Sequence, residues 1–148
     1  YVKEDFEELL QSNEKNKNFI KPSVNQLCIN PLYLQSDLFD YYQKKHDVIV
    51  QAYKPLERAD DTLLKNEKIL KISGKYNISA AQVCLKWGFQ HNLVELVKTN
   101  TPKRMTENIN SLFLKDFSKE EMEYLDSITT SENIENWTKR YIKRKTGL

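Results

Sequence analysis

Three short apolar segments, separated by longer segments with helical spacing, constrain the fold most strongly. They cover residues 23–29, 47–53 and 93–97, and each is rich in β-branched or aromatic residues and short enough to be one strand. Their apolar residues are nearly continuous rather than alternating, which is typical of strands covered on both faces. The alternation of such strands with helices predicts an α/β fold with a parallel sheet.

Helix signals fill the intervals between these strands. The spacing of apolar residues predicts helices over residues 36–45 and 63–72, and Gly74 would end the second helix because it lacks a Cβ. Residues 79–82 and 118–121 have the sequence of capping boxes, so each predicts the start of a further helix. A helix before the first strand completes the predicted order.

A sheet of only three parallel strands would leave two edges open to solvent, which a complete domain avoids. We therefore expect this chain to be part of a larger sheet or barrel. It has 148 residues, starts with Tyr1, and has methionine only at positions 105 and 122. From this we expect that residues upstream of Tyr1 are missing.

The composition narrows the class of partner. The net charge of +2 is the difference between 23 basic and 21 acidic residues, so no global field selects a nucleic acid or a membrane. No apolar stretch approaches the roughly 20 residues of a membrane span. Cys28 and Cys84 both lie in apolar surroundings, which favours buried thiols in a reducing compartment and predicts a cytoplasmic protein.

The segment VKTNTPKRMTEN, residues 97–108, places the cations Lys98 and Arg104 near the start of a predicted helix, for which Pro102 suits the first position. Lys98 and Arg104 oppose the helix dipole there unless an anion compensates them. A helix N-terminus also offers unpaired N–H groups, so a phosphate is the natural ligand. Three small polar residues could donate further hydrogen bonds: Thr99, Asn100 and Thr101. The alternative is an ordinary capped helix with solvated cations.

Two further residues lie at or near the carboxyl ends of predicted strands, where parallel α/β proteins bind ligands. Tyr53 could stack on a flat ring, or it could be a half-buried tyrosine without such a role. Gln26 is a polar residue in an apolar strand and would need a partner if it were buried. That partner could be a ligand amide or a neighbouring backbone group.

Other candidate sites are weaker. His46 and His91 have no cysteine or carboxylate at ligand spacing, so we expect surface histidines and no metal site. The chain ends in a polar and then basic segment, with five cations in residues 139–145. This segment could contact an acidic surface or a nucleic acid, but we favour a solvated terminal helix and do not expect a nucleic acid partner.

Four segments together resemble, in order and at matching separations, the second half of the aldo-keto reductase family. They are PSVNQLCINP, QSDLFDYYQKKHDVIVQAYKPL, SAAQVCLKWGFQ and VKTNTPKRMTENI, and the resemblance runs from about residue 5 to residue 128. It implies a (β/α)8 barrel that reduces small aldehydes or ketones by hydride transfer from NADPH, without metal or flavin. Residues 1–130 would supply the later βα units of this barrel, followed by a tail over residues 131–148.

The resemblance also implies roles for individual residues. Gln26 would bind the nicotinamide carboxamide, and Tyr53 would stack on the nicotinamide ring. Lys98, Thr99 and Arg104 would hold the 2′-phosphate, and Glu107 and Asn108 would contact the adenine. The complete set of expected cofactor-binding residues is Gln26, Tyr53, Lys54, Leu56, Lys98, Thr99, Asn100, Thr101, Arg104, Glu107 and Asn108.

The chain departs from the family around its proline-leucine turn. Lys54, Glu57 and Arg58 stand where the family usually has a small residue and then glycine and serine. Glu57 would repel the pyrophosphate unless Lys54 or Arg58 pairs with it.

The family's catalytic Asp, Tyr, Lys and His lie in the first half of its barrel, so no catalytic residue is expected in this chain. We expect it to be inactive alone and to need the N-terminal half, in cis or as a separate chain. The alternative hypothesis is a non-catalytic scaffold or basic binding module that keeps part of the fold. It predicts salt-dependent binding to an acidic partner through residues 139–145, unaffected by NADPH.

Overall fold

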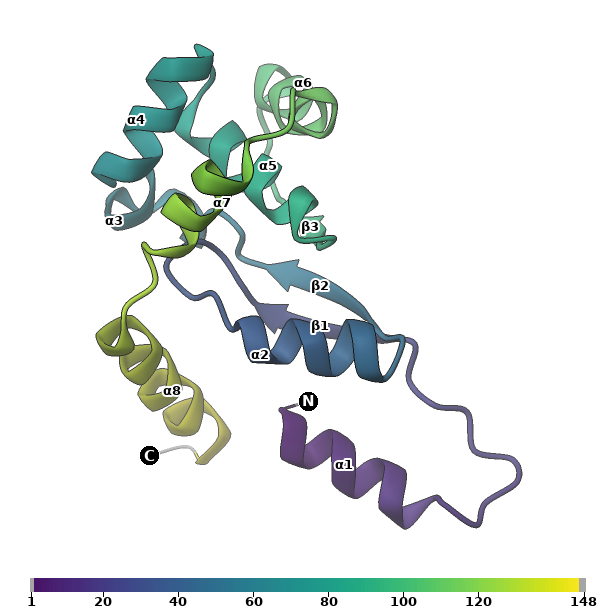
Figure 1. The fold of residues 1–148 in the computed structure, drawn as a ribbon. Helices are drawn as coiled ribbons and strands as arrows, with labels where there is room; N and C mark the ends of the chain where they lie inside the picture. Colours follow the sequence, from purple (N-terminus) through teal and green to yellow (C-terminus); the bar gives the residue numbers. More distant parts are fainter. Residues whose placement is uncertain (1, 147–148) are drawn as a thin grey trace.

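The computed structural model describes residues 2–146, and the side chains of residues 2–139 (Figure 1). Its elements alternate between helices and strands along the chain. In order they are α1 (Lys3–Ser12), β1 (Val24–Cys28), α2 (Ser36–Phe39), the π-helix η1 (Asp40–Lys45), β2 (Ile49–Tyr53), η2 (Glu57–Ala59), α3 (Asp61–Leu64), α4 (Glu67–Tyr76), α5 (Ala80–Gln90), β3 (Val94–Leu96), α6 (Pro102–Asn110), η3 (Ser111–Phe113), α7 (Lys119–Asp126) and α8 (Ser131–Thr146).

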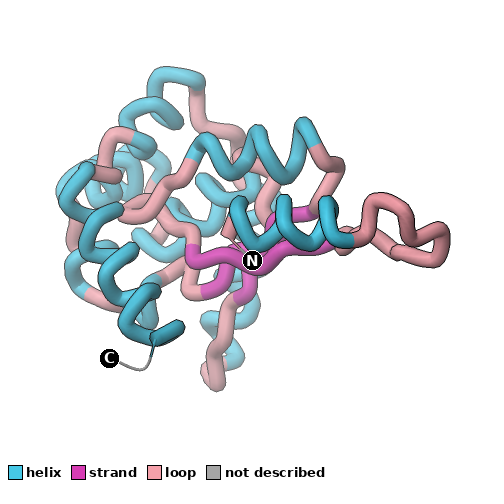
Figure 2. The backbone as a smooth tube through the Cα atoms, turned by 90° about the horizontal axis from the view of Figure 1, so that it is seen from below, coloured by secondary structure: helices cyan, strands magenta, loops and turns pink. Residues whose placement is uncertain are grey.

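The three strands form one parallel sheet in the order β1-β2-β3, which confirms the predicted α/β arrangement. Each strand falls within one of the three predicted apolar segments. The helical segment of α2 and η1 lies alongside the sheet, and α5 leads directly into β3 (Figure 1). The loop between α1 and β1 extends away from the sheet (Figure 2).

One face of the sheet is covered along its length, and the other is not. Leu27, Val50 and Ala52 point to the helices and are buried, whereas Val24, Ile49 and Val94 on the other face are exposed. Ile49, for example, is 52% exposed. This second face, which we call the open face, is covered only toward its carboxyl end, where Cys28 is buried within the described residues. The prediction of strands covered on both faces was therefore wrong for this chain, although both faces have the apolar character that prompted it.

Local helix signals were mostly confirmed. Both predicted capping boxes form, at the N-termini of α5 and α7. The prediction for Gly74 was wrong, because α4 continues to Tyr76 and ends at Asn77. Asn77 adopts the left-handed conformation with φ of 52°, which asparagine tolerates better than most residues.

A carboxylate of α7 joins this helix to α4 by hydrogen bonds. Glu121 accepts hydrogen bonds from the Lys75 ammonium at 2.5 Å and the Tyr76 hydroxyl at 2.7 Å, both from α4. Burial alone would raise the pKa of Glu121, but these bonds and one from the Ser118 N–H outweigh it and lower the pKa to about 2. Charged hydrogen bonds thereby hold α4 and α7 together.

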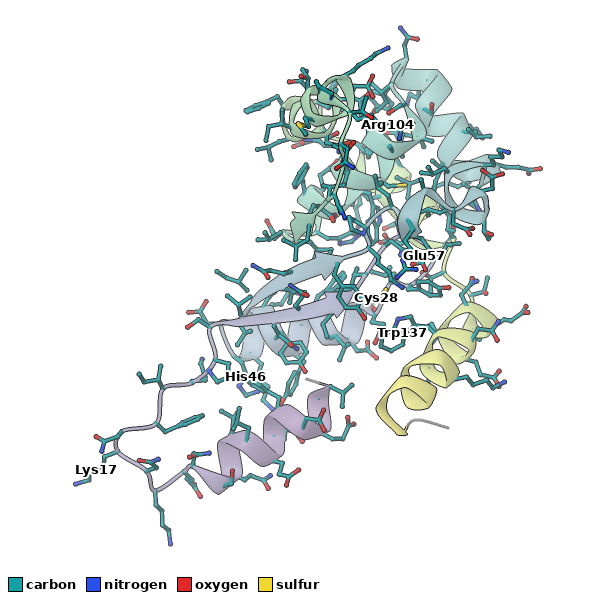
Figure 3. The ribbon with its side chains drawn as sticks, turned by 180° about the vertical axis from the view of Figure 1, so that it is seen from behind. Lys17, Cys28, His46, Glu57, Arg104 and Trp137 are labelled. Atoms are coloured by element: carbon teal, nitrogen blue, oxygen red, sulfur yellow. The ribbon has the colours of Figure 1, made fainter. Side chains whose placement is uncertain are left out.

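The last element of the described residues is α8, which includes the predicted basic segment. Trp137 of α8 is partly buried against the core (Figure 3 labels it). The side chains of the cations beyond Lys139 lie outside the described residues. No helix in the described part of the chain is both long and apolar enough to cross a membrane.

Candidate cofactor-binding site

A cavity of about 830 Å³ lies where β2 and β3 end and α6 begins. It is lined by the loop after β2, the start of α5, and the segment from Leu96 to Asn108. Nearly all predicted cofactor-binding residues line it: Lys54, Leu56, Lys98, Thr99, Asn100, Thr101, Arg104, Glu107 and Asn108. The structure thus brings together residues that are far apart in the sequence, while Gln26 and Tyr53 lie on the strands outside this cavity.

The start of α6 forms the cationic end of the cavity. Thr101 is the N-cap and Pro102 occupies the first turn, as predicted. The side chain of Thr101 makes no capping hydrogen bond, and the first turn contains no acidic residue. Lys98 and Arg104 line the cavity, and neither forms an ion pair with another described residue. Two exposed cations therefore stand at the positive end of a helix dipole without compensation.

One hydrogen bond joins α6 to α5, and a second is local to the C-terminal end of α6. The Gln82 side chain of α5 donates to the backbone carbonyl of Glu107 at 3.2 Å, and the Ser111 hydroxyl donates to the same oxygen at 3.1 Å. Before the helix, Thr99 Oγ1 accepts from the Thr101 N–H at 3.2 Å and shapes the approach to the N-terminus. The cations are thus presented by a positioned helix rather than by a loop alone.

The open face of the sheet carries the other two predicted residues. Gln26, Gln51 and Val94 are paired across the strands in one row, and Cys28, Tyr53 and Leu96 form the next row toward the carboxyl ends. Gln26 is exposed rather than buried, and it donates to the side chain of Gln51 at 3.3 Å. Its partner is therefore a side chain, which the sequence interpretation did not consider. Tyr53 is half-buried at the end of β2.

In the loop after β2, a cation pairs with Glu57, the carboxylate that would otherwise repel a pyrophosphate. Lys54 Nζ lies 3.8 Å from Glu57 Oε1, so one of the two expected pairings forms. Glu57 is absent from the residues that line the cavity, whereas Lys54 and Arg58 are among them. The carboxylate thus does not face the space where an anion would bind.

The histidines differ from the prediction. His91 Nε2 lies 2.9 Å from Asp126 Oδ1, and Trp87 Nε1 donates to the same oxygen at 2.6 Å. His46 is half-buried and packs edge-on against Phe6. The prediction of surface histidines was wrong because folding brings Asp126 to His91 from 35 positions away. Within residues 2–146, no group of three His, Cys, Asp or Glu could hold a metal ion.

One residue near the site was missed altogether. Glu95, in the middle of β3, points to α5, and its Oε2 is buried with no hydrogen-bond partner among the described residues. This burial raises the pKa of Glu95 well above its ordinary value. Gly88 of α5 leaves the room for it, since a Cβ at that position would collide with Glu95 Oε1. The sequence signal that could have identified Glu95 is a carboxylate inside an otherwise apolar strand.

Comparison with known proteins identifies the fold. A family model described as the aldo/keto reductase family matches residues 3–130. The chain is 36% identical over 128 residues to glyoxal reductase of Bacillus subtilis, covering 86% of the chain and 43% of the relative. It is 30% identical over 145 residues to aldehyde reductase YPR1 of Saccharomyces cerevisiae, covering 97% of the chain and 42% of the relative.

Solved structures agree with these matches. Gox0644 in complex with NADPH superimposes with a TM-score of 0.79 at 25% identity, over 90% of this chain and 46% of that chain. The aldo-keto reductase MGS-M4, from a deep-sea metagenome library of the Medee basin, gives 0.73 at 30% identity, over 82% and 44%. The chain spans less than half the length of these relatives, so its three-stranded sheet corresponds to part of a (β/α)8 barrel, as predicted. The chain belongs to the aldo-keto reductase family.

Proposed function

We propose that this chain is the cofactor-binding half of an NADPH-dependent aldo-keto reductase that reduces small aldehydes or ketones to alcohols. The observation that carries the proposal is the uncompensated pair of cations, Lys98 and Arg104, at the N-terminus of α6 in the cavity wall. Such a pair costs several tenths of a kcal/mol unless an anion binds there. The 2′-phosphate of NADPH is an anion of suitable charge, and a structural relative of this chain is known in complex with NADPH.

The remaining residues fit the rest of a dinucleotide. Tyr53 would stack on the nicotinamide ring, and Gln26, one row deeper in the open face, would bind its carboxamide. Glu107 and Asn108, on α6 beyond Arg104, would contact the adenine. NADPH, when bound, supplies the hydride. The residues of this chain bind and orient it at the carboxyl ends of the strands, where barrels of this kind place their active sites.

The proton donor is proposed to come from elsewhere. We place the catalytic Asp, Tyr, Lys and His in the N-terminal half of the barrel, joined in cis or supplied as a separate chain. The open face supports such a partner, because its apolar residues, Val24, Ile49 and Val94, are exposed in the chain described here. The small carbonyl substrate would bind against both halves. Cys28 and Cys84 are both buried, which supports a cytoplasmic location.

The 148-residue chain alone is expected to show a broad thermal transition without a cooperative step. Its sheet exposes both edges and one apolar face, and these require the other half of the barrel for burial. Circular dichroism during heating measures this directly. Co-expression with the N-terminal half should restore a sharp transition; a sharp transition of the chain without any partner would contradict the requirement for one.

The function is tested on the completed barrel, by which we mean this chain together with its N-terminal half. We expect it to oxidise NADPH when a small aldehyde or ketone is added, with alcohol formed in equal amount. The chain without its N-terminal half should show no turnover. A completed barrel that does not bind NADPH in a direct titration would contradict the proposal.

A further inference from the structure

The loop between β2 and α3 is strained. Lys54 has φ of 57°, and Glu57, Arg58 and Ala59 follow with 39°, 62° and 63°. None of these residues is glycine, and the left-handed conformation is unfavourable for a residue with a Cβ. Such strain persists only where surrounding contacts hold the backbone in place. Residues that contact this loop must therefore stabilise its left-handed backbone.

Asn30, two residues beyond the carboxyl end of β1, holds the loop by hydrogen bonds. It is 1% exposed, and its Nδ2 donates to the Lys54 carbonyl at 3.2 Å and to Glu57 Oε2 at 3.2 Å. Its Oδ1 accepts from the Leu32 N–H at 3.0 Å, so the amide itself is fixed. Glu57 Oε1 faces Lys54, and both oxygens of the carboxylate are thus occupied. Figure 3 shows Glu57 in the region where β1 and β2 end.

This anchoring separates the charges of the loop. Glu57 is turned away from the cavity, while Arg58, the next residue, lines it together with Lys98 and Arg104. Arg58 forms no ion pair with another described residue. The cavity therefore has cations at two places (Arg104 is labelled in Figure 3). The loop after β2 supplies Arg58 and also Lys54, which is paired with Glu57. The start of α6 supplies Lys98 and Arg104.

We propose that Arg58 binds the diphosphate of the cofactor, and that Glu57 is a positioning residue that aims Arg58 by anchoring the loop on Asn30. The inference rests on the proposed function. A dinucleotide phosphate has two separate anionic groups, and the two cationic places in the cavity match them. A guanidinium suits a diphosphate, because its planar donors can bind two oxygens at once. The strained backbone is then the means by which adjacent residues point to opposite sides of the loop.

The first test replaces Arg58→Ala in the completed barrel and measures dissociation constants for four probes. NADPH, NADH and ADP all contain a diphosphate, so each should bind about 10- to 100-fold more weakly, in the range of a lost charged hydrogen bond. The fourth probe, 2′-AMP, has only the 2′-phosphate and should bind unchanged. Lys44→Ala is the matched control, because it removes one exposed cation in η1 that does not line the cavity. It should change none of the four constants.

The outcomes separate this inference from the proposed function. If the unaltered completed barrel binds neither NADPH nor NADH, the proposed function fails. If it binds them but Arg58→Ala leaves NADH and ADP unchanged, or weakens 2′-AMP equally, the role of Arg58 is overturned.

The second test asks whether Glu57 positions Arg58. Glu57→Gln keeps an acceptor for Asn30, whereas Glu57→Ala removes it. We expect the loss caused by Arg58→Ala to persist in the Glu57→Gln background and to shrink several-fold in the Glu57→Ala background, because an unanchored Arg58 contributes little. Hydrogen exchange over residues 54–59 should rise only in the Glu57→Ala variant. An equal loss from Arg58→Ala in all backgrounds would overturn the positioning role.

Discussion

Replacing Arg104→Ala in the completed barrel is expected to weaken NADPH binding by about 1.5–3 kcal/mol and to leave NADH binding nearly unchanged. Lys98→Ala should have the same effect. Both side chains line the cavity at the N-terminus of α6, and neither has another ionic partner within the described residues. The two cofactors differ only in the 2′-phosphate, so a residue that binds this group acts on one of them alone.

The measurement is a titration of each variant with both cofactors at fixed salt concentration. Lys119→Ala is a suitable control, since Lys119 is an exposed cation at the start of α7 and does not line the cavity. The Lys119→Ala variant shows how much the loss of one positive charge by itself changes cofactor binding. Equal weakening of NADPH and NADH by Arg104→Ala would place Arg104 at the diphosphate or at the adenine and remove the basis for the 2′-phosphate assignment.

Local sequence signals predicted the elements that position the site. The capping boxes, Pro102 and the apolar segments each depend on residues only a few positions apart, and their outcome in the structure was as expected. The alternation of helices and strands predicted that the segments after the strands meet, because parallel strands place their carboxyl ends at one edge. The assignment of most individual residues to the cofactor came from the resemblance to the family. Most predicted cofactor-binding residues line one cavity, although their contacts with NADPH stay a prediction.

Contacts between distant segments could not be predicted in this way. The pairing of His91 with Asp126 and the anchoring of Glu57 by Asn30 join residues 35 and 27 positions apart. Nor does a continuous apolar strand reveal whether its second face is covered by the same chain. Ile49 fits the pattern of a strand covered on both faces and is nevertheless exposed. Apolar residues indicate that a face needs to be buried, but they do not indicate whether the covering residues belong to the same chain.

Removal of the carboxyl group of Glu95 is expected to increase the stability of the protein. Its Oε2 is buried without a partner among the described residues, and burial raises its pKa well above the ordinary value of 4.5. The folded state therefore binds more protons than the unfolded state above that pH, so the free energy of unfolding should fall as pH rises toward the folded pKa.

Glu95→Met keeps the length of the side chain without its charge. In the completed barrel we expect it to raise the free energy of unfolding by about 1–3 kcal/mol at neutral pH, the usual cost of an unpaired buried polar group. Urea denaturation at several pH values between mildly acidic and mildly alkaline conditions measures both effects. The advantage of the Glu95→Met variant should be smallest at acidic pH and grow as pH rises, because only the original carboxyl can ionise.

Glu123→Met serves as the control, since Glu123 is an exposed carboxylate on α7 paired with Lys119 at 3.8 Å. It should change stability by less than about 0.5 kcal/mol, as surface substitutions usually do. A Glu95→Met variant that is less stable than the original at every pH would mean that Glu95 has a partner in the completed barrel. Because β3 leads directly into the segment with Lys98, that partner would then also help to position the cationic end of the cofactor site.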